Sequence, residues 1–296
     1  MQDILIDTDI GDDIDDALAI AFALNHPEIN VKAITTVWRD TKNRARLVLK
    51  LLKTFNKENI PVAAGIRKPL LGKEQIASIN QLVVIEEKED LPEPSNQNAV
   101  DVIISQVMSH KNLTVVTIGP LTNLALAIIK EPEIIKKTKL VMMGGVFTKQ
   151  GAEGEYNVSC DPEAVKIILE SGMKIIMVGL DVTLKCQLTQ KELNNIADRD
   201  LPSTKLLVKM IRAWQKATKY TFPVLHDPLA VAVALDPTMV KMEPRKVNIE
   251  TRGEFTRGFT IASKSATPNA QICIDVDVDR FITLFMEQIL RETSRR

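Results

Sequence analysis

The densest cluster of reactive side chains lies near the N-terminus, where six of the ten residues from Asp7 to Asp16 are aspartates. One or two of them would fit a helix cap and a solvated turn. Six repel one another, and a helix dipole offsets only about 0.3–1 kcal/mol per charge. No histidine or cysteine lies nearby, so the available ligand atoms are oxygens, which bind hard cations. The cluster therefore predicts a divalent-cation site, with Ca²⁺ favoured over Mg²⁺.

A second candidate for chemistry is the segment His226-Asp227-Pro228, which opens an apolar, helix-forming run. Two other histidines, His26 and His110, stand at the ends of predicted helices and are expected to be structural. An imidazole exchanges a proton near neutral pH. We therefore predict that His226 acts as an acid–base group and supplies or relays a proton.

Polar and aromatic groups also follow several predicted strands. Met143 precedes a glycine pair, and the stretch Gly119–Asn123 could present a backbone carbonyl to a ligand. The segment Glu155-Tyr156-Asn157 offers a carboxylate and an amide that suit a hydroxyl-rich ligand. Aromatic side chains could stack on a flat ligand, although packing in the core is the default explanation for them. These aromatic residues are Trp38, Trp214, Tyr220 and Phe222.

The elements that position these groups alternate between short apolar runs and helical patterns. Strands are predicted at residues 4–6, 31–37, 61–65, 113–118, 139–143 and 174–178, and helices at 15–25, 42–55 and 99–109, with others starting at 121 and 162. Continuous apolar strands are typical of a parallel sheet that is covered on both faces. The sequence therefore predicts an α/β fold with a doubly wound, mainly parallel, Rossmann-like open sheet and helices on both faces.

The last third of the chain has a different pattern. Helices are predicted at residues 201–220, 227–235 and 279–290, and strands at 247–250, 258–262 and 271–275, as a small antiparallel addition to the sheet. We expect one domain over residues 1–296. Residues 72–97 have weak periodicity and read as a long loop, which is either a lid over the site or an ordinary surface excursion.

Composition excludes several classes of function. The 296 residues carry 38 basic and 38 acidic side chains, so no basic field would attract nucleic acid or an anionic membrane. Three cysteines without a Cys-x-x-Cys pair predict neither a zinc cluster nor a disulfide framework, which fits the cytoplasm. The first residues lack the basic region of a signal peptide, and the longest uncharged run contains Gly119-Pro120, so no membrane span is expected.

Taken together, the motifs resemble the inosine–uridine-preferring nucleoside hydrolase family over nearly the whole chain. The matching segments are ILIDTDIG, DDALA, AITTV, PVAAG, IGPLTNLALAI, VMMGGV, EYN, DPEA, IIMVGLDVT and HDPLA. The resemblance implies a metal-dependent enzyme that hydrolyses the N-glycosidic bond of ribonucleosides to ribose and free base. It also implies one Ca²⁺ per chain at the carboxyl ends of the strands, and assembly as a homodimer or homotetramer.

The resemblance also implies roles for individual residues. Asp9 would bind Ca²⁺ and take a proton from the attacking water. Asp16 and Asp227 would bind Ca²⁺ through their carboxylates, and Thr122 through its backbone carbonyl. His226 would lie near the leaving base. The predicted substrate-binding residues are Asp15, Asp40, Met143, Glu155, Asn157, Trp214 and Tyr220.

Two departures from the family pattern affect these assignments. The usual spacing Asp-x-Gly-x-Asp-Asp is longer here by two residues, so Asp13 could replace Asp15 or Asp16 as a ligand. The usual Gly-Asn after the second strand reads Arg39-Asp40, which puts an acid where an amide would approach the ribose. The metal core therefore matches the family better than the sites for base and ribose do.

Two alternatives to a nucleoside hydrolase remain at this point. Asp7-Thr8-Asp9 also matches the Asp-x-Asp motif of magnesium-dependent haloacid-dehalogenase-type phosphatases, although Gly11 stands where Thr or Val is expected. A non-catalytic protein that binds Ca²⁺ and a nucleoside or sugar would also keep the aspartate cluster. Free ribose, inorganic phosphate, or binding without turnover would distinguish the three.

Overall fold

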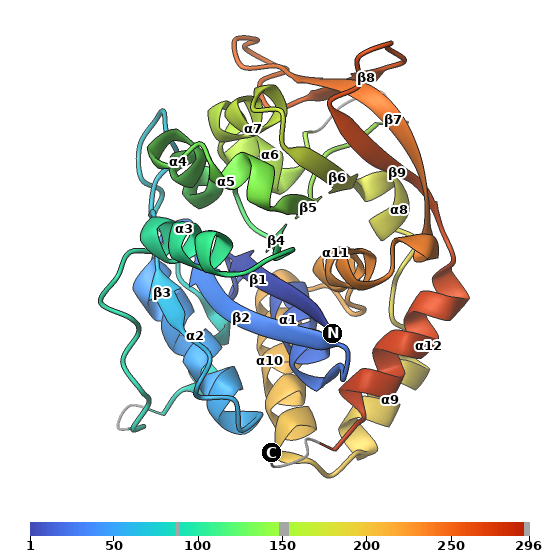
Figure 1. Ribbon diagram of the computed structural model, residues 1–296. Coiled ribbons are helices and arrows are strands. Elements are labelled where there is room, and N and C mark those ends of the chain that lie inside the picture. Colours follow the sequence, from blue (N-terminus) through green and yellow to red (C-terminus); the bar gives the residue numbers. More distant parts are fainter. Residues whose placement is uncertain (87–88, 148–153, 293–296) are drawn as a thin grey trace.

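The computed structural model describes residues 1–86, 89–147 and 154–292, and the strands found there form a single sheet (Figure 1). They are β1 (Gln2–Thr8), β2 (Ile29–Thr36), β3 (Val62–Ala64), β4 (Thr114–Thr117), β5 (Lys139–Met143), β6 (Lys174–Val178), β7 (Val240–Ile249), β8 (Thr260–Ser263) and β9 (Ala270–Val276). Their order across the sheet is β3-β2-β1-β4-β5-β6-β9-β7-β8.

Helices connect most of the strands. They are α1 (Asp15–Asn25), α2 (Thr41–Thr54), α3 (Ala99–Ser109), α4 (Thr122–Lys130), α5 (Ile134–Lys137), α6 (Tyr156–Cys160), α7 (Pro162–Glu170), α8 (Leu180–Thr183), α9 (Gln190–Asp198), α10 (Pro202–Thr218), α11 (His226–Leu235) and α12 (Val278–Ile289), with 3₁₀ turns η1 (Asn80–Val84) and η2 (Pro237–Met239). None of these described helices is both long and apolar enough to cross a bilayer.

The predicted sheet is confirmed, including its small antiparallel addition. Strands β1 to β6 pair in parallel, β9 joins β6 in parallel, and β7 and β8 run antiparallel at that edge. The chain moves outward from β1 to β2 and β3, and then returns to β4 on the other side of β1. Ligands of open α/β sheets bind at such a reversal, outside the carboxyl ends of the strands.

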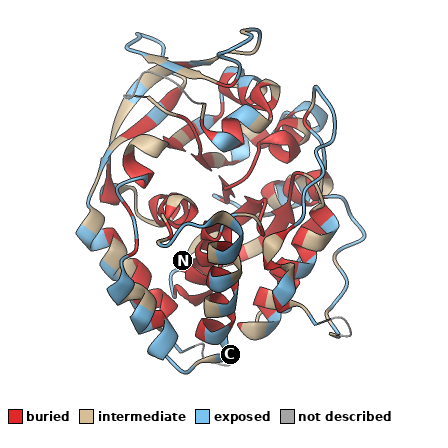
Figure 2. Ribbon diagram, turned by 180° about the vertical axis from the view of Figure 1, so that it is seen from behind, coloured by how far each residue is buried: buried red, intermediate tan, exposed pale blue. Residues whose placement is uncertain are grey.

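Two layers of helices bury the two faces of the sheet. In β1, Ile4 and Ile6 pack into one apolar cluster with helices α1, α10, α11 and α12, whereas Leu5 packs into a second with α3, α4 and α7. Successive strand side chains point to opposite faces, so an unbroken apolar run is what a sheet covered on both sides requires. Figure 2 shows the buried strands between helices whose outer sides are exposed.

Element boundaries agree with the sequence pattern in the first half of the chain and less well in the second. The predicted helices at residues 15–25 and 99–109 are α1 and α3 without a shift. Strand β7 begins at Val240, seven residues before the predicted start at 247, and helix α9 was not predicted. Neither difference moves the carboxyl ends of β1 and β4, where the site is expected.

Candidate active site

A cavity of about 570 Å³ lies where the chain leaves β1 and β4, at the reversal of strand order. This volume is within the range of small-molecule sites. Hollows of about 710 and 420 Å³ occur elsewhere, but neither contains the aspartate cluster. The residues lining the cavity are Asp9, Asp12, Asp13, Asp15, Asp16, Arg39, Asn80, Ile118, Met143, Gly154, Glu155, Tyr156, Asn157, Leu180, Ala217, Thr218, His226 and Asp227.

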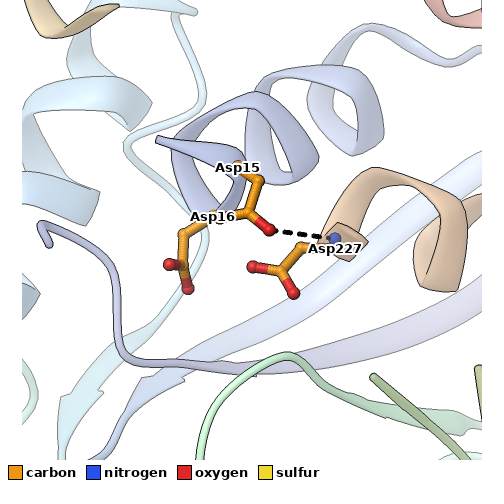
Figure 3. A group of neighbouring side chains, drawn as sticks. All are labelled: Asp15, Asp16 and Asp227. Carbon is orange, nitrogen blue, oxygen red and sulfur yellow. Dashed lines mark hydrogen bonds between the residues drawn. The ribbon is translucent and has the colours of Figure 1, made fainter. Parts of the chain in front are cut away.

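Three buried carboxylates form the centre of this cavity. Asp15, Asp16 and Asp227 each offer an oxygen, and these oxygens lie within 4.8 Å of one another (Figure 3). The first turns of α1 and α11 bring them together, and the Asp15 carboxylate accepts a hydrogen bond of 3.3 Å from the Asp227 backbone N–H. Asp16 also accepts a hydrogen bond from the Thr8 hydroxyl at the end of β1.

Their electrostatics call for a positive partner. Burial and mutual repulsion raise the pKa values of Asp15, Asp16 and Asp227 well above the ordinary range of aspartate. Burial also raises the pKa of Asp9 to about 6, against the opposing charge of Arg44. Buried charges in proteins are paired or coordinate metals. A set of oxygen ligands at this spacing fits a hard divalent cation such as Ca²⁺ or Mg²⁺.

The charge of Arg44 lowers the pKa of Asp16, but the hydrogen bonds of Arg44 do not go to the three-carboxylate group. Its buried guanidinium donates to the backbone carbonyls of Asp9, Ile10 and Trp38, and to the Asp12 carboxylate at 2.8 Å. These bonds fix the turn after β1 rather than the start of α1. The side chain of Asp13 bonds the Ile14 N–H at 2.6 Å and lies outside the group of three. Of the aspartates left open by the spacing, the structure thus groups Asp15 and Asp16, not Asp13, with Asp227.

Asp9 lines the same cavity but is not one of the three carboxylates with oxygens within 4.8 Å. The backbone of Gly119 passes close to it, since a Cβ built on Gly119 would lie 2.8 Å from an Asp9 carboxylate oxygen. This contact joins the turn after β1 to the loop after β4. The side chain of Asp9 is thereby held at the carboxyl edge of the sheet, next to the metal-binding candidates.

The structure places Thr122 outside the lining of the cavity, and its predicted role as a backbone-carbonyl ligand stays a prediction. Thr122 is fully buried at the start of α4, its hydroxyl donates to Asp161 at 2.6 Å, and it is not among the described residues that line the cavity. Ile118, directly after β4, lines the cavity instead, and its backbone carbonyl accepts a hydrogen bond of 3.4 Å from the Asn157 amide. A carbonyl ligand from this loop would therefore come from Ile118.

Asp40, predicted to bind substrate, is not among the described residues that line the cavity. Its carboxylate caps helix α2 by accepting hydrogen bonds from the Asn43 backbone and side-chain amides, at 3.2 and 2.7 Å. Arg39 lines the cavity in its place, and its guanidinium pairs with Asp12 at 3.1 Å. These two departures from the family pattern are therefore in contact. Asp12, in the lengthened turn after β1, pairs with Arg39, which stands where the family usually has glycine.

The residues predicted for the ribose line one side of the cavity. Glu155 caps the short helix α6 and accepts backbone hydrogen bonds from Asn157, Val158 and Gly145 at 2.8, 3.0 and 3.3 Å. Burial raises the pKa of Glu155 to about 7. The Asn157 amide also donates to the Met143 carbonyl at 3.3 Å. The structure therefore brings Glu155, Asn157 and Met143 together at the cavity.

His226 lies at the opening turn of α11 and lines the cavity beside Asp227. Its Nδ1 lies 2.7 Å from the hydroxyl of Thr183, a fully buried residue at the end of α8. Burial lowers the pKa of His226 to about 4, so the neutral ring predominates near pH 7. A neutral imidazole can donate one hydrogen bond and accept another.

Two aromatic residues predicted to bind substrate, one in α10 and one just after it, do not line the cavity. Trp214 is buried in the core, Tyr220 is largely exposed, and neither is among the described residues that line the cavity. Tyr156 lines the cavity instead, and its hydroxyl accepts a hydrogen bond of 3.2 Å from the indole N–H of the buried Trp38. The position of Trp38 after the second strand indicates a residue near the site. No sequence signal singles out Tyr156 within the Glu155–Asn157 motif.

The loop at residues 72–97 reaches the site, although residues 87 and 88 lie outside the described part of the chain. Asn80, in η1, lines the cavity and donates to the Asp12 carbonyl at 2.7 Å, while Gln81 donates to the Asp13 carbonyl. Farther along, Lys50 pairs with Glu89 at 2.6 Å. This loop therefore supplies part of the cavity wall, which an ordinary surface excursion would not do. No sequence signal singled out Asn80.

Comparisons with known proteins show the family and the fold of this chain. Residues 4–283 match the sequence model of the inosine-uridine preferring nucleoside hydrolases. The pyrimidine-specific ribonucleoside hydrolase RihA of Salmonella typhi is 33% identical over 305 residues, covering 97% of each chain. Among solved structures, a plant nucleoside hydrolase, PpNRh1, has a TM-score of 0.88 at 29% identity and covers 98% of this chain and 99% of that one. The purine-preferring ribonucleoside hydrolase of Gardnerella vaginalis has a TM-score of 0.85 at 31% identity, with 98% of both chains covered.

Proposed function

Because this chain belongs to the inosine-uridine preferring nucleoside hydrolase family, and is a ribonucleoside hydrolase acting on N-glycosyl bonds, we propose that its activity depends on one Ca²⁺ bound in the cavity. The observation that carries the proposal is the group of three buried carboxylates at the reversal of strand order. Asp16 and Asp227 would hold the ion, Asp9 would approach it from the end of β1, and the Ile118 carbonyl takes the role first given to Thr122.

Cleavage of a ribosyl C1′–N bond builds positive, oxocarbenium-like charge on the sugar. When bound, Ca²⁺ supplies Lewis-acid polarisation and a fixed position for hydroxyl groups and water. Asp9 accepts the proton of the attacking water, since it is an acid of the cavity that lies outside the group of three. The surrounding carboxylates favour the cationic sugar electrostatically. Asp15, Glu155 and Asn157 bind the ribose hydroxyls.

The leaving base needs a hydrogen-bond donor as it accumulates electrons. His226 is the candidate, because it borders the cavity next to Asp227 and is held in place by Thr183. In the neutral form that its environment favours, it acts by donating a hydrogen bond or by relaying a proton from water. Substitution of His226 by Ala should slow hydrolysis of inosine or uridine by about 10²–10⁴-fold. Cleavage of p-nitrophenyl riboside, whose leaving group needs no proton, should hardly change.

The phosphatase alternative has no support, because the family match extends over residues 4–283. A panel of purine and pyrimidine ribonucleosides, assayed for free ribose with Ca²⁺ and with a chelator, tests the proposal. Ribose release that needs Ca²⁺ is expected. Undiminished release by the chelated, metal-free enzyme would contradict the calcium requirement, and tight nucleoside binding without ribose would support the non-catalytic alternative.

The panel needs both base classes, since one similar protein is named pyrimidine-specific and another purine-preferring. We also propose assembly as a homodimer or homotetramer, which the family resemblance implies. Sedimentation equilibrium of the full chain tests this second point. A monomer at micromolar concentration would contradict it.

A further inference from the structure

We propose that Thr183 positions His226 for catalysis by selecting one tautomer of its ring. In this arrangement the Thr183 hydroxyl donates its hydrogen bond to Nδ1, and the proton of the neutral ring is on Nε2. The inference starts from the 2.7 Å contact between the two side chains. It rests on the proposed function only for its catalytic consequence, because the tautomer itself is a property of the resting protein.

The hydroxyl of Thr183 needs an acceptor for its own proton. Thr183 is fully buried at the end of α8, and its hydroxyl forms no second hydrogen bond within the described parts of the chain. A buried hydroxyl proton without a partner costs about 1–3 kcal/mol. Donation to Nδ1 removes this cost, and it is possible only when Nδ1 carries no proton. The burial of Thr183 therefore favours the Nε2–H tautomer of His226.

The other ring nitrogen is left for the cavity. Within the described residues no hydrogen bond is formed by Nε2 of His226, although His226 lines the cavity. No carboxylate is bonded to Nδ1, so the ring is not held as a charged pair of the kind that many catalytic histidines form. The Nε2–H tautomer thus presents a donor to the cavity. Such a donor suits a leaving base, whose ring nitrogens and carbonyl oxygens are acceptors.

The hydrogen bond between Thr183 and His226 joins two helices that border the cavity. Thr183 closes the short helix α8, whose first residue, Leu180, lines the same cavity. His226 is the first residue of α11, and Asp227 follows it. The Thr183–His226 hydrogen bond therefore ties α8 to the turn that carries a metal-binding candidate. Loss of the hydroxyl should leave both helices in place, because each also packs in the core through buried neighbours such as Val182 and Leu229.

The chain contains reference histidines for both tautomers, which makes the proposal directly measurable. Nδ1 of His26 accepts a hydrogen bond of 3.2 Å from the Glu28 N–H, so in its neutral form His26 carries its proton on Nε2. Nδ1 of His110 lies 3.0 Å from the Gln106 carbonyl, which can only accept, so the proton of His110 is on Nδ1. Long-range ¹H–¹⁵N correlation spectra of the ¹⁵N-labelled protein at alkaline pH distinguish the two patterns.

In the wild-type full chain we expect His226 to give the His26 pattern, with the His226→Ala variant assigning its signals. In Thr183→Val, which keeps the side-chain shape, we expect a mixture of tautomers and a fall of about 10- to 100-fold in kcat for inosine or uridine. Thr183→Ser restores the hydroxyl and should restore both the spectrum and kcat. Cleavage of p-nitrophenyl riboside should be nearly unchanged in each variant.

A His110-like pattern for His226 in the wild-type protein would overturn the proposal, and this test does not depend on any variant folding. Equal rate losses on nucleosides and p-nitrophenyl riboside, without rescue by Thr183→Ser, would also overturn the positioning role. If no nucleoside of the panel were cleaved, the proposed function would fail while the spectrum still decided the tautomer.

Discussion

Replacement of Asp227 by Asn should make the metal-free protein more stable and abolish its response to Ca²⁺. The group of three carboxylates has oxygens within 4.8 Å of one another, so an ionised pair repels by about 3.5 kcal/mol at an effective dielectric constant of about 20. The amide removes two of the three pairs, about 7 kcal/mol in the fully ionised limit. Proton uptake relieves much of this repulsion, so we expect a gain of about 1–2 kcal/mol, the size typical of a single substitution.

Thermal unfolding in a chelator and in Ca²⁺ measures both effects. In the chelator, Asp227→Asn should melt about 3–6 °C above the wild type, since 1 kcal/mol shifts the Tm of a large domain by about 2–4 °C. At a Ca²⁺ concentration of about 100 times Kd, the wild type should gain about 2.7 kcal/mol, and the variant should gain nothing. Asp198→Asn, at an exposed position at the end of α9, is the matched control and should respond to Ca²⁺ like the wild type.

Two results would refute the reasoning. A wild-type Tm that is the same in chelator and in Ca²⁺ would mean that the three carboxylates hold no such ion. A lower Tm for Asp227→Asn in the chelator would mean that hydrogen bonds of the carboxylate outweigh its repulsion from Asp15 and Asp16. Direct metal analysis of the calcium-supplemented wild type should find one divalent ion per chain.

Three further predictions concern the ribose and the turns around the cavity. 2′-Deoxyuridine should have a kcat/KM about 5–150-fold below that of uridine, because a lost hydroxyl leaves a buried polar group unpaired at about 1–3 kcal/mol; equal values would contradict the ribose site. Gly119→Ala places a Cβ 2.8 Å from an Asp9 oxygen, so kcat should fall about 10²-fold while circular dichroism stays native; full activity would show that Asp9 tolerates displacement. Asp12→Ala should lower the free energy of unfolding by about 1–2 kcal/mol in urea titrations, since it removes the acid paired with the buried Arg44; the estimate allows for the 30% exposure of Asp12, and an unchanged midpoint would refute it.

The parallel sheet was predictable because each strand is a short apolar run with a helix pattern after it. The same signal is weak where the pattern changes. Strand β7 has only two buried residues, Val240 and Val247, and it includes Pro244, so its first half lacks the apolar run of the other strands. Helix α9 follows a capping box formed by Thr189 and Glu192. This sequence signature marks the start of a helix and could have predicted α9.

The part of the site that is formed by residues adjacent in the sequence could be predicted. The carboxylates of Asp15 and Asp16 are placed by the first turn of α1, which the sequence specifies locally. A residue after a strand can turn its side chain toward the ligand or toward a neighbouring helix, and the side chains of Thr122 and Asp40 bond to neighbouring helices. Partners decided the direction, namely Asp161 for Thr122 and Asn43 for Asp40. Spacing alone does not specify such partners.

The pairing of Asp12 with Arg39 and Arg44 has an evolutionary consequence. Without Arg39, the acid in this turn, which is already crowded with aspartates, would keep only Arg44 as a cationic partner, and without that acid Arg39 would lose its partner next to the cavity. The two changes are therefore epistatic, and reverting either one toward the usual family residue should be worse than reverting both. Homologues with the longer turn are expected to carry a basic residue at position 39, and those with the short turn to lack it.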